Sequence, residues 1–271
     1  MWRIGHKGAK GPDENTAPAL KKALRAGADG VEFDIRMSKD GALVIFHDPK
    51  VDGFTNGSGY IKDLDFNELK QLKLNGSNEV IPSSYEVFSA IAREGKPKVM
   101  QIDLKVPGTG RQLLNQIYRF GFEDIVIISS FHKSILEEIR GLDSKIKTGL
   151  IKYLPANGPI EYLAPESEEN RAVRKAKETL HRAYLYMMLP LNIISGSAFS
   201  DLIKDAKEIN ADYIMFWWGA TTKSLVKKAH KKGLGVVVGE VNTEKRIRRM
   251  ERKQVDGIVT DCAELLRPSR Q

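Results

Sequence analysis

Short apolar runs rich in β-branched residues alternate with amphipathic helical stretches along almost the whole chain. The runs expected to form strands are residues 2–6, 29–35, 98–104, 124–128, 145–151, 212–216, 234–239 and 255–259. Helices are expected between them, the first at 16–25 with Asn15 as its N-cap. Near-continuous apolar strands separated by helices are typical of a parallel sheet covered by helices, and about eight such units close a barrel. The pattern therefore predicts an α/β fold, a (β/α)8 TIM barrel that forms a single domain over residues 1–271.

Two insertions are expected in this barrel. Residues 42–46 extend strand 2 as a hairpin, and a small insertion follows at about 48–80, with a glycine-rich loop and a short helix at 66–74. A longer insertion at about 155–196, between strands 5 and 6, contains a basic helical run at 171–182 and an apolar tract. It could be a lid or a membrane-facing flap, or an enlarged loop with its own packed helix.

Composition limits the compartment and the partners. The single cysteine, Cys262, excludes an intramolecular disulfide and fits a reducing compartment, so we expect a cytoplasmic protein. We expect no signal peptide, because no long apolar run follows a basic head near residue 1, and no membrane-spanning helix, because no run of about 18 apolar residues occurs. The net charge of +8 favours anionic partners, namely phosphate esters, acidic membrane surfaces or nucleic acid, although a solvated basic surface explains it equally well.

Three carboxylates are candidate metal ligands. Glu32 and Asp34 lie two apart on a predicted strand, so their side chains share a face. Two buried carboxylates repel each other unless a cation separates them, and Mg²⁺ and Ca²⁺ prefer oxygen ligands. Asp103 ends another strand, with Lys105 on the same face, at the end of the barrel where such enzymes place their sites. Ion pairs with lysines at the solvent rim are the alternative.

Two histidines stand at the ends of the first two strand units. His6 ends the first strand and His47 ends the hairpin of the second. Cleavage of a phosphodiester requires one proton to be removed from the nucleophile and another to be given to the leaving group, and imidazoles do both near neutral pH. Asp48 could orient His47, or it could belong to an ordinary turn with the proline that follows it.

Ordered motifs over almost the whole chain resemble those of the glycerophosphodiester phosphodiesterases, a family of phospholipase C-like barrels. The motifs are His6-Lys7-Gly8, Asp13-Glu14-Asn15-Thr16, Gly27-Ala28-Asp29-Gly30-Val31-Glu32-Phe33-Asp34, Ser38-Lys39-Asp40-Gly41, His47-Asp48, Ile81-Pro82, Asp103-Leu104-Lys105, Ser129-Ser130-Phe131 and Val255 to Asp261.

This resemblance implies hydrolysis of glycerophosphodiesters to glycerol phosphate and an alcohol. It implies a divalent cation, Mg²⁺ or Ca²⁺ and also Mn²⁺, on Glu32, Asp34 and the position of Asp103. His6 and His47 would form the acid–base pair. Lys7 and Lys105 would hold the phosphate oxygens.

Several positions depart from the family's pattern. Lys7 stands where the family has arginine, and Asp103 stands where it has glutamate. Gly239 replaces the tryptophan that commonly walls the glycerol pocket. Trp217 could fill that space or pack at the rim, and Glu240 could be an extra ligand or the partner of a lysine.

These changes affect the expected substrate more than the expected reaction class. A small phosphodiester remains the first candidate, with Phe131, Trp217 and Glu240 as substrate contacts. Hydrolysis of a lysophospholipid or other lipid phosphodiester, with peripheral membrane contact, and a barrel that binds phosphodiesters without cleaving them are the alternatives. We expect no nucleic-acid partner, because no RNA-binding motif or aromatic platform accompanies the lysines.

Overall fold

The described residues of the chain, 1–152, 196–262 and 265 of this computed structural model, form a sheet that closes on itself. Its strands are β1 (Trp2–Gly5), β2 (Gly30–Met37), β3 (Leu43–Ile45), β4 (Val99–Leu104), β5 (Val126–Ser130), β6 (Lys147–Ile151), β7 (Tyr213–Trp217), β8 (Gly235–Gly239) and β9 (Gly257–Thr260). They follow the order β1-β9-β8-β7-β6-β5-β4-β2-β3, and β1 also pairs with β2. All pairings are parallel except that of β3 with β2, so the predicted (β/α)8 barrel is confirmed.

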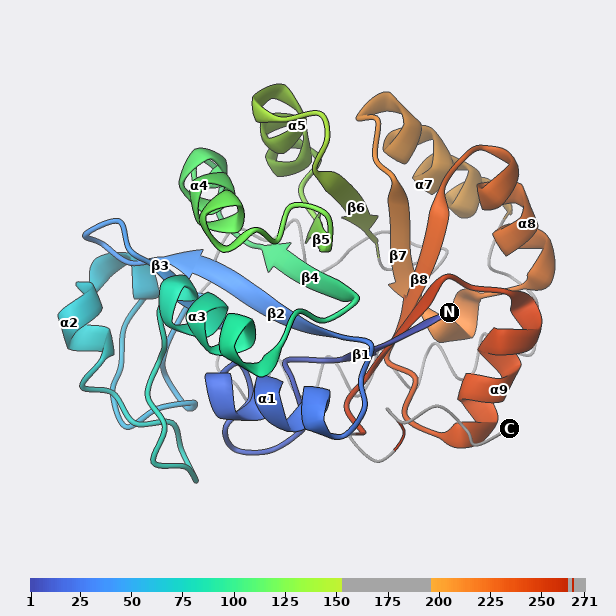
Figure 1. Ribbon diagram of the computed structural model, residues 1–271. Coiled ribbons are helices and arrows are strands. Elements are labelled where there is room, and N and C mark those ends of the chain that lie inside the picture. Colours follow the sequence, from blue (N-terminus) through green and yellow to red (C-terminus); the bar gives the residue numbers. More distant parts are fainter. Residues whose placement is uncertain (153–195, 263–264, 266–271) are drawn as a thin grey trace.

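Helices cover the outside of the barrel (Figure 1). They are α1 (Ala17–Arg25), α2 (Phe66–Leu69), α3 (Ser84–Glu94), α4 (Gly110–Phe120), α5 (Lys133–Leu142), α7 (Gly196–Glu208), α8 (Lys223–Lys231) and α9 (Glu244–Lys253), with 3₁₀ turns η1 (Ile61–Asp63) and η3 (Trp218–Ala220). Ser or Thr side chains at the N-caps of α1, α3, α8 and α9 accept hydrogen bonds from the first turn. In the described part of the chain, none of these helices has the length and apolar character needed to cross a membrane.

Apolar side chains fill both sides of the sheet. Between sheet and helices, two large clusters centre on residues such as Phe33 and Phe88 in one half and Phe199 and Ile214 in the other. A smaller cluster fills the inside of the barrel, and it consists of Ile4, Val99, Ile127, Met215, Val237 and Val259. This plug supports the floor of the pocket described below.

The small insertion after strand 2 is also confirmed. β3 returns beside β2 with Met37 opposite Leu43, and the chain then runs through η1 and α2 before α3. Its apolar side chains form a cluster of their own, which includes Val51, Ile61 and Leu69. The helix predicted at 66–74 is shorter than expected and spans only Phe66–Leu69, because Leu74 instead pairs with Thr55 in an extended bridge. The longer insertion predicted at about 155–196 lies outside the described residues.

Candidate active site

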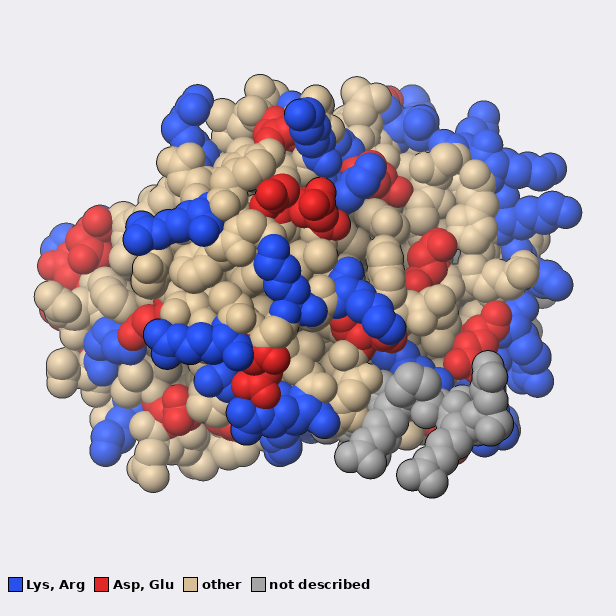
Figure 2. Space-filling model, viewed as in Figure 1, with Lys and Arg blue, Asp and Glu red and all other residues tan. Residues whose placement is uncertain are grey.

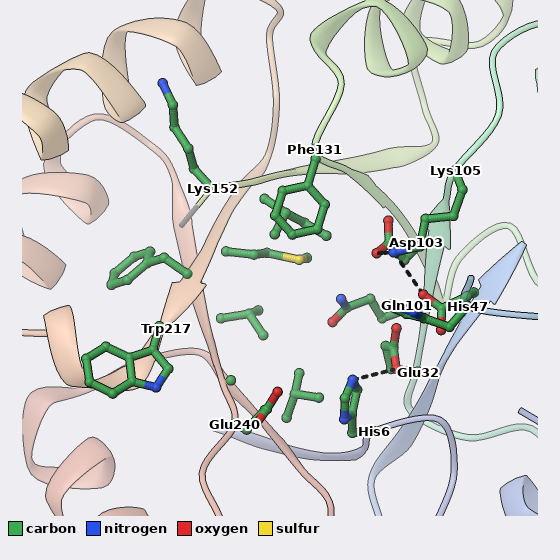
Figure 3. Close-up of a pocket in the computed structure, with 17 residues that line it drawn as sticks. His6, Glu32, His47, Gln101, Asp103, Lys105, Phe131, Lys152, Trp217 and Glu240 are labelled. Atoms are coloured by element: carbon green, nitrogen blue, oxygen red, sulfur yellow. Dashed lines mark hydrogen bonds and ion pairs between the residues drawn. The ribbon is translucent and has the colours of Figure 1, made fainter. Parts of the chain in front are cut away.

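A pocket opens at the carboxyl ends of the barrel strands (Figure 3). Its lining consists of His6, Glu32, Asp34, His47, Gln101, Asp103, Lys105, Phe131, Ile151, Lys152, Met215, Phe216, Trp217, Val237, Gly239, Glu240 and Val259. Most of the ionisable groups come from β1, β2, β4 and the loops that follow them, whereas most of the apolar groups come from β6 to β9. The pocket therefore has a charged side and an apolar side.

Three buried carboxylates converge on the charged side. Glu32 and Asp34 extend from β2 and Asp103 from β4, where Asp34 and Asp103 are direct neighbours in the strand register. Each residue is at most 4% exposed. One oxygen from each lies within 4.8 Å of the others. The alternation of side chains along the two strands thus brings the predicted ligand set together.

Asn15 and the backbone after β1 hold two of these carboxylates. The Asn15 amide donates to Asp34 Oδ2 (2.9 Å) and accepts from the Asp34 N–H (3.2 Å). The prediction that Asn15 caps α1 is therefore wrong, and Thr16 is the N-cap. The Lys7 N–H donates to Glu32 Oε2 (2.9 Å). The turn needs glycine at position 8, where φ is +87° and a Cβ would lie 2.5 Å from the Ala19 carbonyl carbon.

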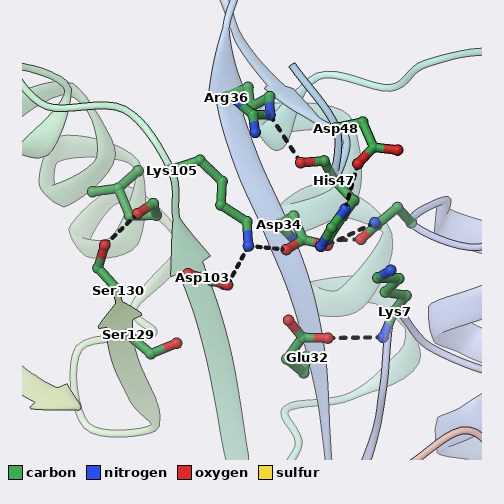
Figure 4. A network of polar contacts seen from close by, with 12 residues as sticks. Lys7, Glu32, Asp34, Arg36, His47, Asp48, Asp103, Lys105, Ser129 and Ser130 are labelled. Carbon is green, nitrogen blue, oxygen red and sulfur yellow. Dashed lines mark hydrogen bonds and ion pairs between the residues drawn. The ribbon is translucent and has the colours of Figure 1, made fainter. Parts of the chain in front are cut away.

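The Lys105 ammonium lies between one carboxylate oxygen of Asp34 and one of Asp103 (Figure 4). Its Nζ is 3.0 Å from Asp34 Oδ1 and donates a short hydrogen bond to Asp103 Oδ2. The second oxygen of Asp103 is buried and has no hydrogen-bond partner among the described residues. A buried acceptor beside two other carboxylates fits a hard cation, which would take oxygen ligands.

The pKa values of the three carboxyls show how unevenly this charge is compensated. Burial, together with the charge of Asp34, raises the pKa of Glu32 to about 7. Burial also raises the pKa of Asp103, although Lys105 opposes the shift. For Asp34 the burial effect is outweighed by Lys105, His47 and Lys7, so its pKa is held below the usual range. A further cation would favour the ionised forms of Glu32 and Asp103 and so oppose these two shifts.

His6, near the start of the chain, is held by residues that come late in the sequence. Its Nδ1 lies 2.6 Å from Asp261 Oδ1, and Asn242 donates to the other oxygen of Asp261. Its Nε2 lies 3.9 Å from Glu32 Oε2. Burial lowers the pKa of His6, but the Asp261 hydrogen bond and the charge of Glu32 prevail and raise it to about 9. His6 is therefore an imidazolium at neutral pH, with Nε2 directed to the pocket.

His47 has the opposite character. Its Nδ1 is 2.9 Å from Asp48 Oδ1, and its carbonyl accepts a hydrogen bond from Arg36 Nε (2.9 Å). Desolvation by the surrounding protein atoms is the largest effect on the ring and lowers its pKa to about 4, against the pull of Asp34. His47 is therefore neutral at neutral pH.

The apolar side of the pocket is formed mainly by Ile151, Met215, Phe216, Val237 and Val259. Trp217, at the end of β7, and Glu240, which directly follows β8, stand at its rim, and Trp217 is opposite Gly239 in the strand register (Figure 3). The indole of Trp217 lies against Gly219, where a Cβ would be 1.9 Å from the ring. Phe131 lines the boundary with the charged side, and the Lys105 ammonium lies 5.6 Å from its ring centre.

The predicted site residues all come to this region, with one difference in position. Lys7 does not line the pocket, although its ammonium is near enough to Asp34 and Glu32 for their charges to raise its pKa against the effect of burial. Sequence reasoning missed Asp261 as the partner of His6, and it missed Gln101. Asp261 directly follows the last strand, so strand-end position was the signal that could have found it.

The chain matches a known protein family over most of its length. The model of the glycerophosphoryl diester phosphodiesterase family matches residues 6–265. The chain belongs to this family. The resemblance noted in the sequence is thereby confirmed, and so is the prediction of a phosphodiesterase of this kind.

Individual relatives cover nearly the full chain. A glycerophosphodiester phosphodiesterase of Caldanaerobacter subterraneus subsp. tengcongensis is 31% identical over 97% of this chain and 95% of its own. A putative glycerophosphoryl diester phosphodiesterase of Silicibacter pomeroyi has a similar fold, with a TM-score of 0.74, 22% identity, and coverage of 98% of this chain and 91% of its own. An Oleispira antarctica phosphodiesterase, solved with the product sn-glycerol-3-phosphate, has a TM-score of 0.72, 19% identity, and coverage of 98% and 95%.

Proposed function

We propose that this chain is a metal-dependent hydrolase of glycerophosphodiesters, which releases glycerol phosphate and an alcohol. The observation that carries the proposal is the position of two histidines, each hydrogen-bonded to a carboxylate, around a buried cluster of three carboxylates. Family membership supports the reaction class. The glycerol phosphate bound by the Oleispira antarctica protein supports the substrate class.

Glu32, Asp34 and Asp103 would hold the divalent cation, and Mg²⁺, Ca²⁺ and Mn²⁺ all suit an oxygen ligand set. When bound, the cation neutralises phosphoryl oxygens and lowers the pKa of the attacking hydroxyl. Lys105 would hold a non-bridging oxygen from the pocket wall. Lys7, set back behind the carboxylates, would add positive charge to the same end of the pocket.

The two histidines would move the protons. In the first step, neutral His47 takes the proton of a glycerol hydroxyl, the hydroxyl oxygen bonds to phosphorus, and His6 Nε2 protonates the departing alcohol oxygen. The product is a cyclic glycerol phosphate. In the second step, His6 takes a proton from water as water attacks, and His47 returns a proton to the glycerol oxygen. Both residues end as they began, and Asp261 and Asp48 hold the rings in place throughout.

A substrate panel with histidine variants tests the proposal. We expect the protein to release glycerol phosphate from glycerophosphocholine, glycerophosphoethanolamine and glycerophosphoglycerol, and both His6→Ala and His47→Ala to remove nearly all turnover. His230→Ala is the matched control, because His230 is an exposed histidine on α8 outside the pocket. Wild-type rates from both pocket variants would contradict the proposal. Binding of the panel without any product would instead favour the non-catalytic barrel.

The apolar side of the pocket favours one second candidate, a phosphodiester whose alcohol carries an acyl chain. Five apolar side chains face the charged cluster across the pocket, and such a wall could bury methylene groups. Adding a lysophospholipid to the same panel tests it, since rejection of every acylated substrate would eliminate this candidate. For the compartment, we keep the cytoplasm as the proposal, based on the single cysteine.

A further inference from the structure

The outer surface of α8 and α9 carries a concentration of basic side chains. We call it the α8–α9 face, and its exposed basic residues are Lys223, Lys227, Lys228, Lys231, Lys232, Lys245, Arg248, Arg249 and Arg252. Figure 2 shows lysine and arginine side chains crowding the right-hand edge of the molecule, where Figure 1 places α8. No aspartate or glutamate occurs between Trp218 and Gly239, so α8 itself has no acidic residue.

Helix stability does not explain this charge. Lys223, Lys227 and Lys231 follow one another at spacings of four, which places like charges side by side on one face and destabilises a helix. Lysines in the last turn interact favourably with the helix dipole, but Lys223 begins the helix, where the dipole favours acidic residues and α8 has none. The arrangement costs folding stability, and an external anion bound to the lysines would compensate for it.

On the neighbouring helices α7 and α9, basic and acidic side chains form ion pairs. On α7, Lys204 lies 3.9 Å from Glu208 at the same spacing of four. On α9 the two acidic residues are already in ion pairs, Glu244 with Arg248 (2.7 Å) and Glu251 with Arg3 (3.2 Å). The acidic residues of α9 are therefore engaged and do not offset the lysines of α8.

We propose that the α8–α9 face docks the protein on an anionic phospholipid surface. A pair of neighbouring helices, with exposed basic side chains over several turns, matches a broad surface of diffuse negative charge. Nucleic acid fits less well, because the exposed large apolar side chains of the described residues are Met1, Tyr85 and Tyr118, none of which lies on α8 or α9 to stack with bases.

The face also borders the pocket. α8 follows directly from the Trp217–Ala220 segment at the pocket rim, and α9 begins four residues after Glu240. Docking through this face would therefore hold the pocket rim close to the lipid headgroups. This proposal is independent of the proposed reaction, and it uses a surface different from the basic run predicted at 171–182.

Vesicle co-sedimentation tests the proposal with the full chain. Wild-type protein should bind phosphatidylcholine vesicles that contain about one third phosphatidylglycerol, should not bind pure phosphatidylcholine, and should dissociate as salt rises from about 0.05 to 0.5 M. The triple variant K223E/K227E/K231E should lose at least about tenfold in vesicle partitioning, since each basic residue near such a surface strengthens binding roughly fivefold. The exposed lysines of the control variant K22E/K39E/K145E lie elsewhere, and its partitioning should fall by less than about threefold.

Each remaining outcome has a defined meaning. Equal losses in both triple variants would show that only net charge matters and would overturn the proposal. Absence of wild-type binding, or equal binding to neutral vesicles, would also overturn it. So would tighter binding to mixed-sequence duplex DNA that depends on the α8 lysines. Circular dichroism checks that each variant folds, and K223Q/K227Q/K231Q, which should lose binding in the same direction, replaces the glutamate variant if that one does not.

Discussion

The charged side and the apolar side of the pocket differ in burial and in electrostatics. On the side of β1, β2 and β4, Glu32, Asp34 and Asp103 are buried together. Hydrogen bonds and an ion pair from neighbouring residues hold the carboxylates of Glu32 and Asp34 in place. On the side of β7 and β8, Trp217 and Glu240 stand at the rim of an apolar wall and are partly exposed. The carboxylates on the first side repel one another, and a bound cation would relieve that repulsion, whereas the second side determines the shape of the pocket. Changes on the two sides should therefore differ in kind as well as in size.

The largest effect should come from the carboxylate cluster. Glu32→Gln removes one charge from the proposed cation site while keeping the shape of the side chain, so kcat/KM for glycerophosphocholine should fall by at least about a thousandfold. Glu240→Gln makes the same chemical change on the other side of the pocket and should cost less than about tenfold. Initial rates with both variants measure the contrast. Comparable losses of kcat/KM in the two variants would contradict the different roles assigned to the two sides of the pocket.

Loss of either histidine should follow closely. His6→Ala or His47→Ala should lower kcat by about 10²–10⁴-fold with little change in KM, because proton transfer belongs to the transition state. Steady-state kinetics with a phosphodiester substrate measures this effect. A substrate with a good leaving group such as p-nitrophenol should rescue the variant that lacks the acid more than the one that lacks the base. Equal rescue of the two variants would contradict their separate roles.

Asp261 should have an intermediate effect as a positioning residue. Asp261→Asn keeps a hydrogen-bond partner for His6 but removes the charge that favours the imidazolium, so kcat should fall by about 10–100-fold. The pKa of His6 should fall with it, which moves the alkaline limb of the kcat–pH profile downward in pH. Asn242→Ala, which removes the residue that holds Asp261, should move the profile in the same direction but less far. An unshifted profile with reduced kcat would indicate a merely structural role.

The smallest effects should be on metal-free stability, and their sign follows from Glu32. The pKa of Glu32 is about 7 in the folded protein and 4.5 when unperturbed, so the folded state binds the proton more tightly. The contribution of Glu32 to the free energy of unfolding should therefore fall by on the order of 1–3 kcal/mol as pH rises from about 4.5 to about 7, whereas His47, with its pKa lowered to about 4, contributes a change of opposite sign. Urea unfolding with a chelator present should show this Glu32 contribution as a difference in slope between Glu32→Gln and both the wild type and Glu240→Gln. Glu32→Gln should lack it, and an unchanged slope in that variant would contradict the assignment.

Local sequence rules were sufficient for most of the barrel and for the charged side. Alternation along β2 and β4 placed Glu32, Asp34, Asp103 and Lys105 on one face, and the strand register brought them together. The prediction for Asn15 was wrong, because a residue with φ of 62° before the helix can direct its amide to Asp34 while Thr16 serves as the cap. Cap preferences describe a helix in isolation and do not include a buried carboxylate nearby.

Contacts that depend on closure of the barrel could not be predicted in this way. Asp261 is 255 positions from His6 in the chain, and the two meet only because β9 pairs with β1. The helix predicted at 66–74 ended early for a related reason, since Leu74 pairs with Thr55 across the small insertion. Long-range pairing of this kind overrides local helical propensity.

The most direct test of the central claim is a titration of metal into chelator-treated wild-type protein while glycerol phosphate release is measured. We expect no turnover in the chelator, and saturable recovery as Mg²⁺, Ca²⁺ or Mn²⁺ is added. Asp103→Asn should require a much higher metal concentration for half-maximal recovery. The substitution removes the negative charge from the side chain whose buried oxygen has no hydrogen-bond partner among the described residues. Full activity in the chelator, or the same metal dependence in Asp103→Asn and wild type, would contradict the account.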